Sequence, residues 1–195
     1  MVKPFTPNDA YARKARSEGY LTRSAYKLKA ITEKFGLLKP GNRVLDLGAA
    51  PGSWLQVASE LVGPSGSVVG VDLSPIAFRA KNVITMQQDI LTPAFEAALA
   101  EYGPFDAILS DAAPATSGIK DQDQAKSFEL AEQALAIAET NLKSGGALVA
   151  KLFQSSETKN LADRARRIFK QAQLHKPKAS RERSFETYLI CLKKL

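Results

Sequence analysis

A glycine-rich turn constrains the fold of this chain more than any other feature. Residues 46–54 read Asp-Leu-Gly-Ala-Ala-Pro-Gly-Ser-Trp and directly follow a short apolar run, Val44-Leu45. An acidic residue that closes a strand before such a turn is how α/β sheets present backbone N–H groups to a small ligand. Gly48 and Gly52 let the backbone turn tightly and approach that ligand without a Cβ. We therefore expect a strand, a ligand-binding turn and a helix in this order.

The order of the other expected elements predicts an α/β fold. Apolar runs predict strands over 43–47, 67–72, 83–87, 105–110, 147–153 and 186–192. Helical spacing and helix-ending residues predict helices over 24–35, 54–61, 93–102, 124–142 and 160–173. Strands that alternate with helices are typical of a mainly parallel sheet, whose ligands bind beyond the carboxyl ends of the strands.

Composition limits the classes to which the chain can belong. Its 195 residues, 45% of them hydrophobic, predict a single domain over 21–195, preceded by a basic, flexible arm over 1–20. No apolar run approaches the roughly 18 residues of a membrane span, and no secretion signal opens the chain, so we expect a cytoplasmic monomer. One cysteine and one histidine exclude an internal disulfide, a multi-cysteine zinc site and a histidine-based triad.

Positive charge is concentrated at both ends of the chain. Residues 1–43 carry ten Lys/Arg and three Asp/Glu, and residues 159–195 carry eleven and three, whereas residues 44–158 carry six and fourteen. If the two ends meet in the fold, they form one cationic face suited to a nucleic-acid backbone. The candidate backbone contacts are Arg13, Lys14, Arg16, Arg23, Arg164, Arg166, Arg167, Lys170, Lys178, Arg181 and Arg183. Solvated helix faces are the simpler explanation for some of the four within 164–170.

Acidic residues follow three of the expected parallel strands. Asp72 lies about 20–25 residues after the glycine-rich turn, where a carboxylate can accept hydrogen bonds from both ribose hydroxyls of a nucleoside. Asp89 follows the third strand and is placed to hold an adenine amino group, and Asp111 follows the fourth. Taken singly, Asp72 and Asp89 also fit helix N-caps or solvated loop residues. Their spacing behind the turn favours ligand binding.

A lysine closes the fifth strand. Lys151 follows the apolar run Ala147-Leu148-Val149-Ala150, where a charge is costly unless it is paired or functional. Neighbouring strand ends would place it beside Asp111 at the mouth of one cleft. Glu186 opens the last strand, and Lys27 lies on the first expected helix, where a solvated lysine is the ordinary interpretation.

Five segments together resemble one family. They are Arg-Ser-Ala-Tyr-Lys-Leu (23–28), the turn itself (46–54), Ser-Asp-Ala-Ala-Pro (110–114), Lys-Leu-Phe-Gln (151–154) and Lys-Pro-x-x-Ser-Arg-x-Arg-Ser-x-Glu (176–186). In this order they resemble the FtsJ/RrmJ-type ribosomal RNA 2′-O-methyltransferases of the large ribosomal subunit. The turn resembles the first motif of enzymes that use S-adenosylmethionine (SAM), and no Gly-x-Gly-x-x-Gly dinucleotide fingerprint is present.

The resemblance implies a Rossmann-like methyltransferase fold, with a mainly parallel seven-stranded sheet, an antiparallel last strand and helices on both faces. It implies a catalytic tetrad of Lys27, Asp111, Lys151 and Glu186. Gly52, Trp54, Asp72, Asp89 and Asp111 match the family's SAM-contacting positions, and Asp46 and Gly48 join them as parts of the turn. The implied substrate is a uridine in the A-loop of 23S rRNA in the large subunit, and no metal is implied.

The role of Lys151 stays open at this point. Burial and Lys27 would lower its pKa, whereas Asp111 and Glu186 would raise it, so either a neutral base or an orienting cation is compatible with the sequence. Three other functions also stay open: 2′-O-methylation of tRNA or of an mRNA cap, NAD(P)-linked oxidoreduction, and a non-catalytic role in RNA binding or ribosome assembly. The absent fingerprint disfavours the oxidoreductase, and the complete tetrad disfavours the non-catalytic factor.

Overall fold

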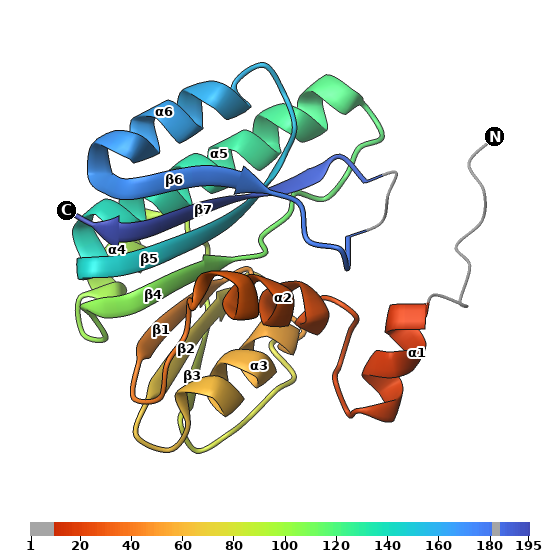
Figure 1. Cartoon of the computed structure of the whole chain (residues 1–195), viewed down its shortest axis with the longest axis vertical. Coiled ribbons are helices and arrows are strands. Elements are labelled where there is room, and N and C mark those ends of the chain that lie inside the picture. The colour runs from red at the N-terminus through yellow and green to blue at the C-terminus, as the bar shows by residue number, and fades with distance from the viewer. Residues whose placement is uncertain (1–9, 181–183) are drawn as a thin grey trace.

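The computed structural model of the chain describes residues 10–180 and 184–195. Its centre is a seven-stranded sheet with the strand order β3-β2-β1-β4-β5-β7-β6 (Figure 1). The strands are β1 (Arg43–Leu47), β2 (Ser67–Asp72), β3 (Val83–Gln87), β4 (Phe105–Ser110), β5 (Leu142–Phe153), β6 (Phe169–His175) and β7 (Glu186–Lys194). β7 runs antiparallel to β5 and β6, and the ladders among β1 to β5 are parallel. The predicted mainly parallel sheet with an antiparallel last strand is confirmed.

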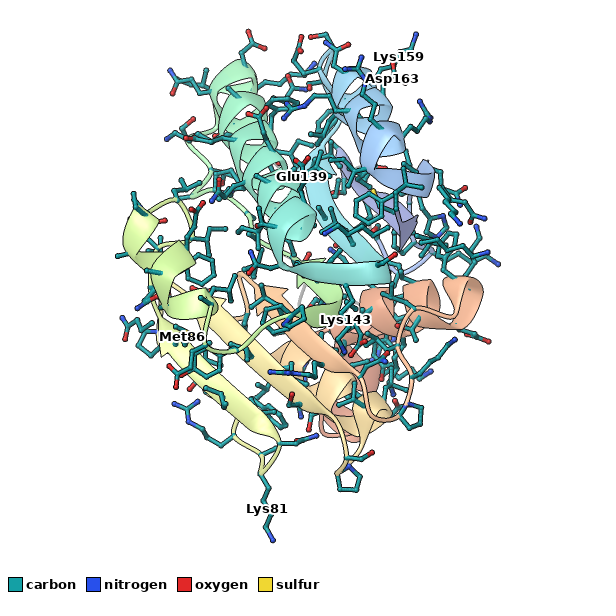
Figure 2. The ribbon with its side chains drawn as sticks, turned by 90° about the vertical axis from the view of Figure 1, so that its left-hand side faces the viewer. Lys81, Met86, Glu139, Lys143, Lys159 and Asp163 are labelled. Atoms are coloured by element: carbon teal, nitrogen blue, oxygen red, sulfur yellow. The ribbon has the colours of Figure 1, made fainter. Side chains whose placement is uncertain are left out.

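Helices cover both faces of this sheet, as Figure 2 shows in an end-on view. One face carries α2 (Ala25–Phe35) and α3 (Ser53–Val62), which share a hydrophobic core with β1 and β2. The other carries α4 (Pro93–Leu99), α5 (Lys120–Asn141) and α6 (Thr158–Ile168), which form a second core with the opposite side of the strands. No helix in the described ranges is long and apolar enough to cross a membrane.

The central strands are buried on both faces, which explains their nearly continuous apolar sequences. In register, Leu45 of β1 lies between Val69 of β2 and Ile108 of β4, and all three side chains are buried. β1, β2, β3, β4 and β5 are parallel, so they end at the same edge of the sheet. The residues that follow these strands are thereby brought together.

The predicted basic helix over 160–173 is wrong in its last five residues. α6 ends at Ile168, and the chain continues directly as β6, which pairs antiparallel with β7. Phe169, the first residue of β6, is 1% exposed and lies in the core beneath α6. The backbone ladder with β7 and the burial of this aromatic ring outweigh a local helical preference, because helix propensities are small per residue.

The expectation of a flexible arm is wrong for its described part. Residues 10–17 form α1 (Ala10–Ser17), and Ala15 and Tyr20 are buried in the first core. The ring of Tyr11, four residues before Ala15, lies 5.6 Å from the ring of Tyr26 on α2. One apolar face of a short helix, formed by residues four apart, thus attaches this segment to the domain. Residues 1–9 lie outside the described part of the chain.

Candidate active site

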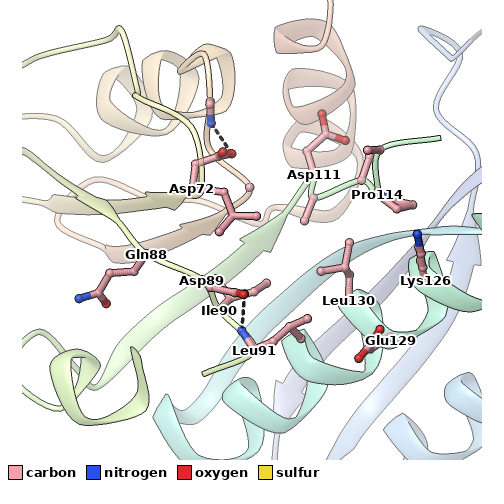
Figure 3. Close-up of a pocket in the computed structure, with 16 residues that line it drawn as sticks. Asp72, Gln88, Asp89, Ile90, Leu91, Asp111, Pro114, Lys126, Glu129 and Leu130 are labelled. Carbon is pink, nitrogen blue, oxygen red and sulfur yellow. Dashed lines mark hydrogen bonds between the residues drawn. The ribbon is translucent and has the colours of Figure 1, made fainter. Parts of the chain in front are cut away.

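A cavity of about 480 Å³ opens at the carboxyl edge of the sheet (Figure 3). Its walls come from the segments that follow β1, β2, β3 and β4, and from one side of α5. Asp72, the last residue of β2, lines it together with Asp89 and Asp111, which follow β3 and β4. The structure brings these three carboxylates to one cavity, at the place where ligands bind parallel α/β sheets.

Asp72 and Asp89 are held by backbone N–H groups. Asp72 accepts a hydrogen bond from the N–H of Ala50 at 2.9 Å and another from the N–H of Ser74 at 2.8 Å, one on each carboxylate oxygen. Asp89 accepts from the N–H of Leu91 at 3.0 Å. Each carboxylate oxygen can accept two hydrogen bonds, so both side chains are fixed yet retain acceptor positions toward the cavity.

Asp46 lies behind the cavity and does not line it. Its side chain is fully buried, and neither carboxylate oxygen has a hydrogen-bond partner within the described part of the chain. Burial raises the pKa of Asp46 well above its ordinary value, and the charges of Asp111 and Asp72 raise it further. Burial and its two neighbours thus favour the neutral form of Asp46. The negative charge at this place belongs to Asp72 and Asp111, which line the cavity and suit a cationic group there.

The glycine-rich turn shapes the site more than it lines it. Gly48 borders the cavity with a φ of 73°, and a Cβ there would lie 2.4 Å from the Cα of Ala112. Gly52 has a φ of 122°, and a Cβ there would lie 2.4 Å from the Cβ of Phe78. Trp54 is buried and donates its indole N–H to the carbonyl of Ser24 at 3.0 Å. Neither Gly52 nor Trp54 lines the cavity.

Lys151 and Asp111 form a buried pair beside the cavity. The ammonium nitrogen of Lys151 lies 3.2 Å from Oδ1 of Asp111 and donates a short hydrogen bond to the carbonyl oxygen of the same residue. The two side chains are 6% and 16% exposed. Asp111 therefore belongs both to the cavity wall and to the lysine pair, and it connects the two.

Lys27 and Glu186 form a second pair, from α2 and the start of β7. Nζ of Lys27 lies 2.9 Å from Oε2 of Glu186, and Lys27 is buried although it sits on a helix. Burial alone would raise the pKa of Glu186, but the ammonium groups of Lys27 and Lys151 hold it below its ordinary value. The four residues of the predicted tetrad therefore converge, and the interpretation of Lys27 as a solvated helix residue is wrong.

Tyr188 joins the two pairs, and sequence analysis did not identify it. Its hydroxyl donates to Oδ1 of Asp111 at 2.8 Å, and the ammonium of Lys27 lies 5.7 Å from its ring centroid. The ring stacks on Trp54 at 5.8 Å, and burial raises the pKa of the phenol well above its ordinary value. A tyrosine two residues after Glu186, on the same face of the strand, was the one available signal.

The two basic ends of the chain meet near these pairs. The guanidinium of Arg23 donates to the carbonyl of Ala179, and Lys34 reaches His175 at 3.4 Å. Of the candidate RNA contacts, Arg13, Lys14 and Arg16 are exposed on α1 and Lys178 is exposed after β6, whereas Arg181 and Arg183 lie outside the described residues. Of the other candidates, Lys170 is exposed on β6, and Arg164, Arg166 and Arg167 lie on α6, on the face opposite α2.

Two of the arginines on α6 are engaged within the protein. Arg164 pairs with Glu132 of α5, and Arg166 pairs with Asp163 one turn earlier on its own helix. These contacts, together with the position of α6, favour solvated helix faces over nucleic-acid contacts for this group.

Known proteins match the chain over nearly its whole length. A family model described as FtsJ-like methyltransferase covers residues 20–194. Ribosomal RNA large subunit methyltransferase E of Syntrophobacter fumaroxidans is 50% identical over 188 residues, which is 95% of either chain. The protein of the same name from Bdellovibrio bacteriovorus is 44% identical over 193 residues, 97% of this chain and 98% of its own.

Solved structures agree with this result. A ribosomal RNA methyltransferase from Plasmodium falciparum superposes with a TM-score of 0.80 at 31% identity, over 90% of this chain and 99% of that one. Aeropyrum pernix fibrillarin, solved with natively bound SAM, has a TM-score of 0.62 at 19% identity, over 87% and 76%, and shares the fold. The predicted Rossmann-like methyltransferase fold is thereby confirmed, and the chain belongs to the FtsJ-like methyltransferase family.

Proposed function

We propose that this protein transfers a methyl group from SAM to a ribose 2′ oxygen of the ribosomal RNA of the large subunit. One observation carries the proposal: Asp111 lines the large cavity and at the same time holds Lys151. A cofactor cavity and an alcohol-activating group therefore meet at a single residue. The relatives named as large-subunit rRNA methyltransferases supply the substrate class.

The cavity fits the cofactor in charge and in hydrogen-bonding groups. SAM carries a sulfonium and an ammonium, and the negative charges of Asp72 and Asp111 in the cavity wall suit both. Asp72, fixed by two backbone N–H groups, is placed to accept from the ribose hydroxyls, and Asp89 from the adenine amino group. Gly48 borders the cavity without a Cβ, which there would lie 2.4 Å from the Cα of Ala112.

When bound, SAM supplies a methyl group that its sulfonium already makes electrophilic. The protein must then orient the ribose hydroxyl in line with that methyl and manage one proton. Nζ of Lys151 has three hydrogen-bonding positions, and two acceptors of Asp111 occupy two of them. The third position is left for the 2′ oxygen.

Lys151 acts there in one of two protonation states. As an amine it takes the proton of the hydroxyl. As an ammonium it donates to the oxygen and steadies the negative charge that develops on it, while the hydroxyl proton passes to solvent. The single-turnover rate against pH separates the two states. A rate that rises with pH identifies the amine, and a rate that falls in alkali identifies the ammonium.

Lys27 and Glu186 position the substrate beside Lys151. Glu186 contributes a negative charge that interacts with both lysines, and Lys27 neutralises it at 2.9 Å. The exposed basic residues Arg13, Lys14, Arg16 and Lys178, together with Arg23, supply contacts to the RNA backbone. Arg181 and Arg183 complete this set in the proposal. We assign the protein as a cytoplasmic monomer whose target is a uridine of the A-loop of 23S rRNA in the assembled large subunit.

The decisive experiment maps ribose methylation by mass spectrometry. Large subunits that lack the modification are incubated with the protein and SAM, and we expect one new 2′-O-methyluridine. Parallel samples contain protein-free rRNA of the same sequence and tRNA. Methylation of tRNA instead would promote a sibling enzyme, and subunit binding without methyl transfer would promote an assembly factor.

Thermal denaturation tests the cofactor separately. S-adenosylhomocysteine should raise the melting temperature, and Asp72→Ala should weaken its binding by about 1–3 kcal/mol, because hydrogen bonds to a carboxylate are lost. An equal shift with NAD would contradict the cofactor assignment.

A further inference from the structure

Two smaller cavities meet at Glu186 and Ser184, beside the lysine pairs. One, of about 200 Å³, is lined by Arg23 and Lys27. The other, of about 370 Å³, lies between the start of α5 and the start of β7 and is lined by Phe185. The first cavity is cationic and the second has an aromatic wall, although both share the same carboxylate.

Phe185 is unusually placed for a large apolar side chain. It is 61% exposed, immediately before Glu186. The ammonium of Lys120 lies 5.6 Å from its ring centroid. An accessible aromatic ring with a cation near it is a common platform for stacking nucleobases. The ring stays exposed in the folded protein, so packing within the domain does not explain why a phenylalanine stands at this position.

The reaction geometry brings the target base to the same place. The base is attached to C1′ of the ribose, one bond from the carbon that bears the reacting 2′ oxygen. Once that oxygen lies at Lys151, the base must therefore leave the ribose within a few ångströms of the tetrad. Lys151 pairs with Tyr188 in the antiparallel β5–β7 ladder, and Phe153 pairs with Glu186. Phe153 and Glu186 both line the aromatic cavity, which therefore begins two ladder positions from Lys151.

Two other polar side chains of this cavity are engaged within the protein. Asp123 accepts hydrogen bonds from the N–H of Ser117 at 2.7 Å and from its hydroxyl at 2.9 Å. The side-chain amide of Gln124 donates to the carbonyl of Gln154. The cavity therefore offers a stacking surface in preference to a set of groups that would read the edge of a particular base.

From these contacts we infer that Phe185 is the stacking platform for the base of the methylated nucleotide, with the RNA backbone passing the cationic cavity at Arg23 and Lys27. The inference rests on the proposed function and deepens it. The platform holds a splayed base by its face, as proteins commonly do with single-stranded RNA. It contributes to substrate affinity and leaves the identity of the base to other contacts.

A double cycle between protein and RNA tests this contact. The protein carries Phe185 or Phe185→Ala, and a synthetic RNA loop carries the target nucleotide with its base or as an abasic site. Affinity and single-turnover rate are measured for all four combinations. Each single change should weaken RNA binding about 5- to 150-fold, and the two together should cost little more than one, because both remove the same stack.

Three further samples control the experiment. Leu174→Ala removes another exposed apolar side chain, on β6 and outside both cavities, and should change nothing. Phe185→Trp should restore binding. Calorimetry with S-adenosylhomocysteine should give the same affinity for Phe185→Ala and for the unaltered protein, which shows that the variant is folded.

Two results would overturn the inference while leaving the proposed function intact: multiplicative losses in the cycle, or coupling of Phe185 to an abasic site at a neighbouring nucleotide. Unchanged RNA binding by Phe185→Ala would overturn it too. If the unaltered protein methylates no ribose in any RNA, the proposed function fails, and the assignment of this platform fails with it.

Discussion

Two lysine–aspartate pairs join the same neighbouring strands, β4 and β5, one at each end. At the edge where the parallel strands begin, Nζ of Lys143 lies 2.8 Å from Oδ1 of Asp106 (Lys143 is labelled in Figure 2). At the carboxyl edge, Nζ of Lys151 lies 3.2 Å from Oδ1 of Asp111. The side chains of the first pair are 41% and 26% exposed, and those of the second are 6% and 16% exposed. The same two residue types therefore meet in two different environments.

The two pairs differ in the free-energy cost of holding their charges in the folded protein. Water solvates Lys143 and Asp106, so their attraction is screened and separating them costs little free energy. Lys151 and Asp111 have lost most of their water, and burial of charge is expensive even when it is paired. The protein maintains the buried pair only at the edge where the cavity opens. The contrast indicates that the first pair contributes modestly to stability and that the second serves the reaction.

The largest expected effect is on the rate. Lys151→Ala should lower turnover about 10²- to 10⁴-fold, the usual contribution of a positioned acid–base group. Lys143→Ala, at the other end of the same strand, should leave turnover unchanged. Single-turnover methylation assays with both variants measure this, and S-adenosylhomocysteine binding checks that each is folded. Retention of more than about a tenth of the rate by Lys151→Ala would remove it from the centre of the mechanism.

The next effect is on stability. Asp111→Asn leaves the buried ammonium of Lys151 without a carboxylate and should lower the free energy of unfolding by about 1–3 kcal/mol. Asp106→Asn should cost about 0–1 kcal/mol, because solvent replaces the lost partner of Lys143. Urea denaturation of both variants measures the difference. Equal losses would show that the two environments are less different than the exposed fractions indicate.

Tyr188→Phe should have a smaller effect on the rate, and it should act only through the pair of Lys151 and Asp111. The substitution removes the hydroxyl that donates to Asp111 at 2.8 Å and keeps the ring on Trp54. We expect kcat to fall about tenfold, corresponding to about 1.4 kcal/mol, with KM for RNA unchanged, because Asp111 loses one of the groups that orient it. A change confined to melting temperature would make Tyr188 a packing residue.

The pair of Lys27 and Glu186 should make the stability of the protein depend on pH in the acid range. The pKa of Glu186 is held below its ordinary value of about 4.5, after burial is offset by Lys27 and Lys151. The ionised form is favoured in the folded state, so this contribution is complete above the ordinary pKa and is lost as the pH falls through the lowered one. Melting temperatures of the unaltered protein and Glu186→Gln should therefore converge in acid and separate toward neutrality. A constant difference at all pH values would contradict this.

The sequence predicts the carboxyl edge well because its residues stand out locally. The sequence alone identifies Lys151, a lysine after an apolar strand, and Asp111, an acid after the neighbouring strand. It does not identify Tyr188, because a tyrosine in an apolar strand is normally a core residue, and only the fold shows that its hydroxyl meets Asp111. For the same reason β6 was predicted as helix, since its ladder with β7 depends on residues far along the chain.

The smallest expected effect is that of salt on the stability contributed by the exposed pair of Lys143 and Asp106. Lys143→Ala should lower the free energy of unfolding by at most about 1 kcal/mol at low ionic strength, and the difference should shrink as salt is added, because the Debye length falls to about 3 Å at 1 M. Asp106 also accepts the N–H of Arg43 at 2.7 Å, so it stays anchored to β1 when the lysine is removed. Denaturation in 0.05 M and 1 M salt measures the change. Lys151 is shielded from solvent, so the destabilisation caused by Asp111→Asn should persist at high salt, and its loss there would show that water reaches the buried pair.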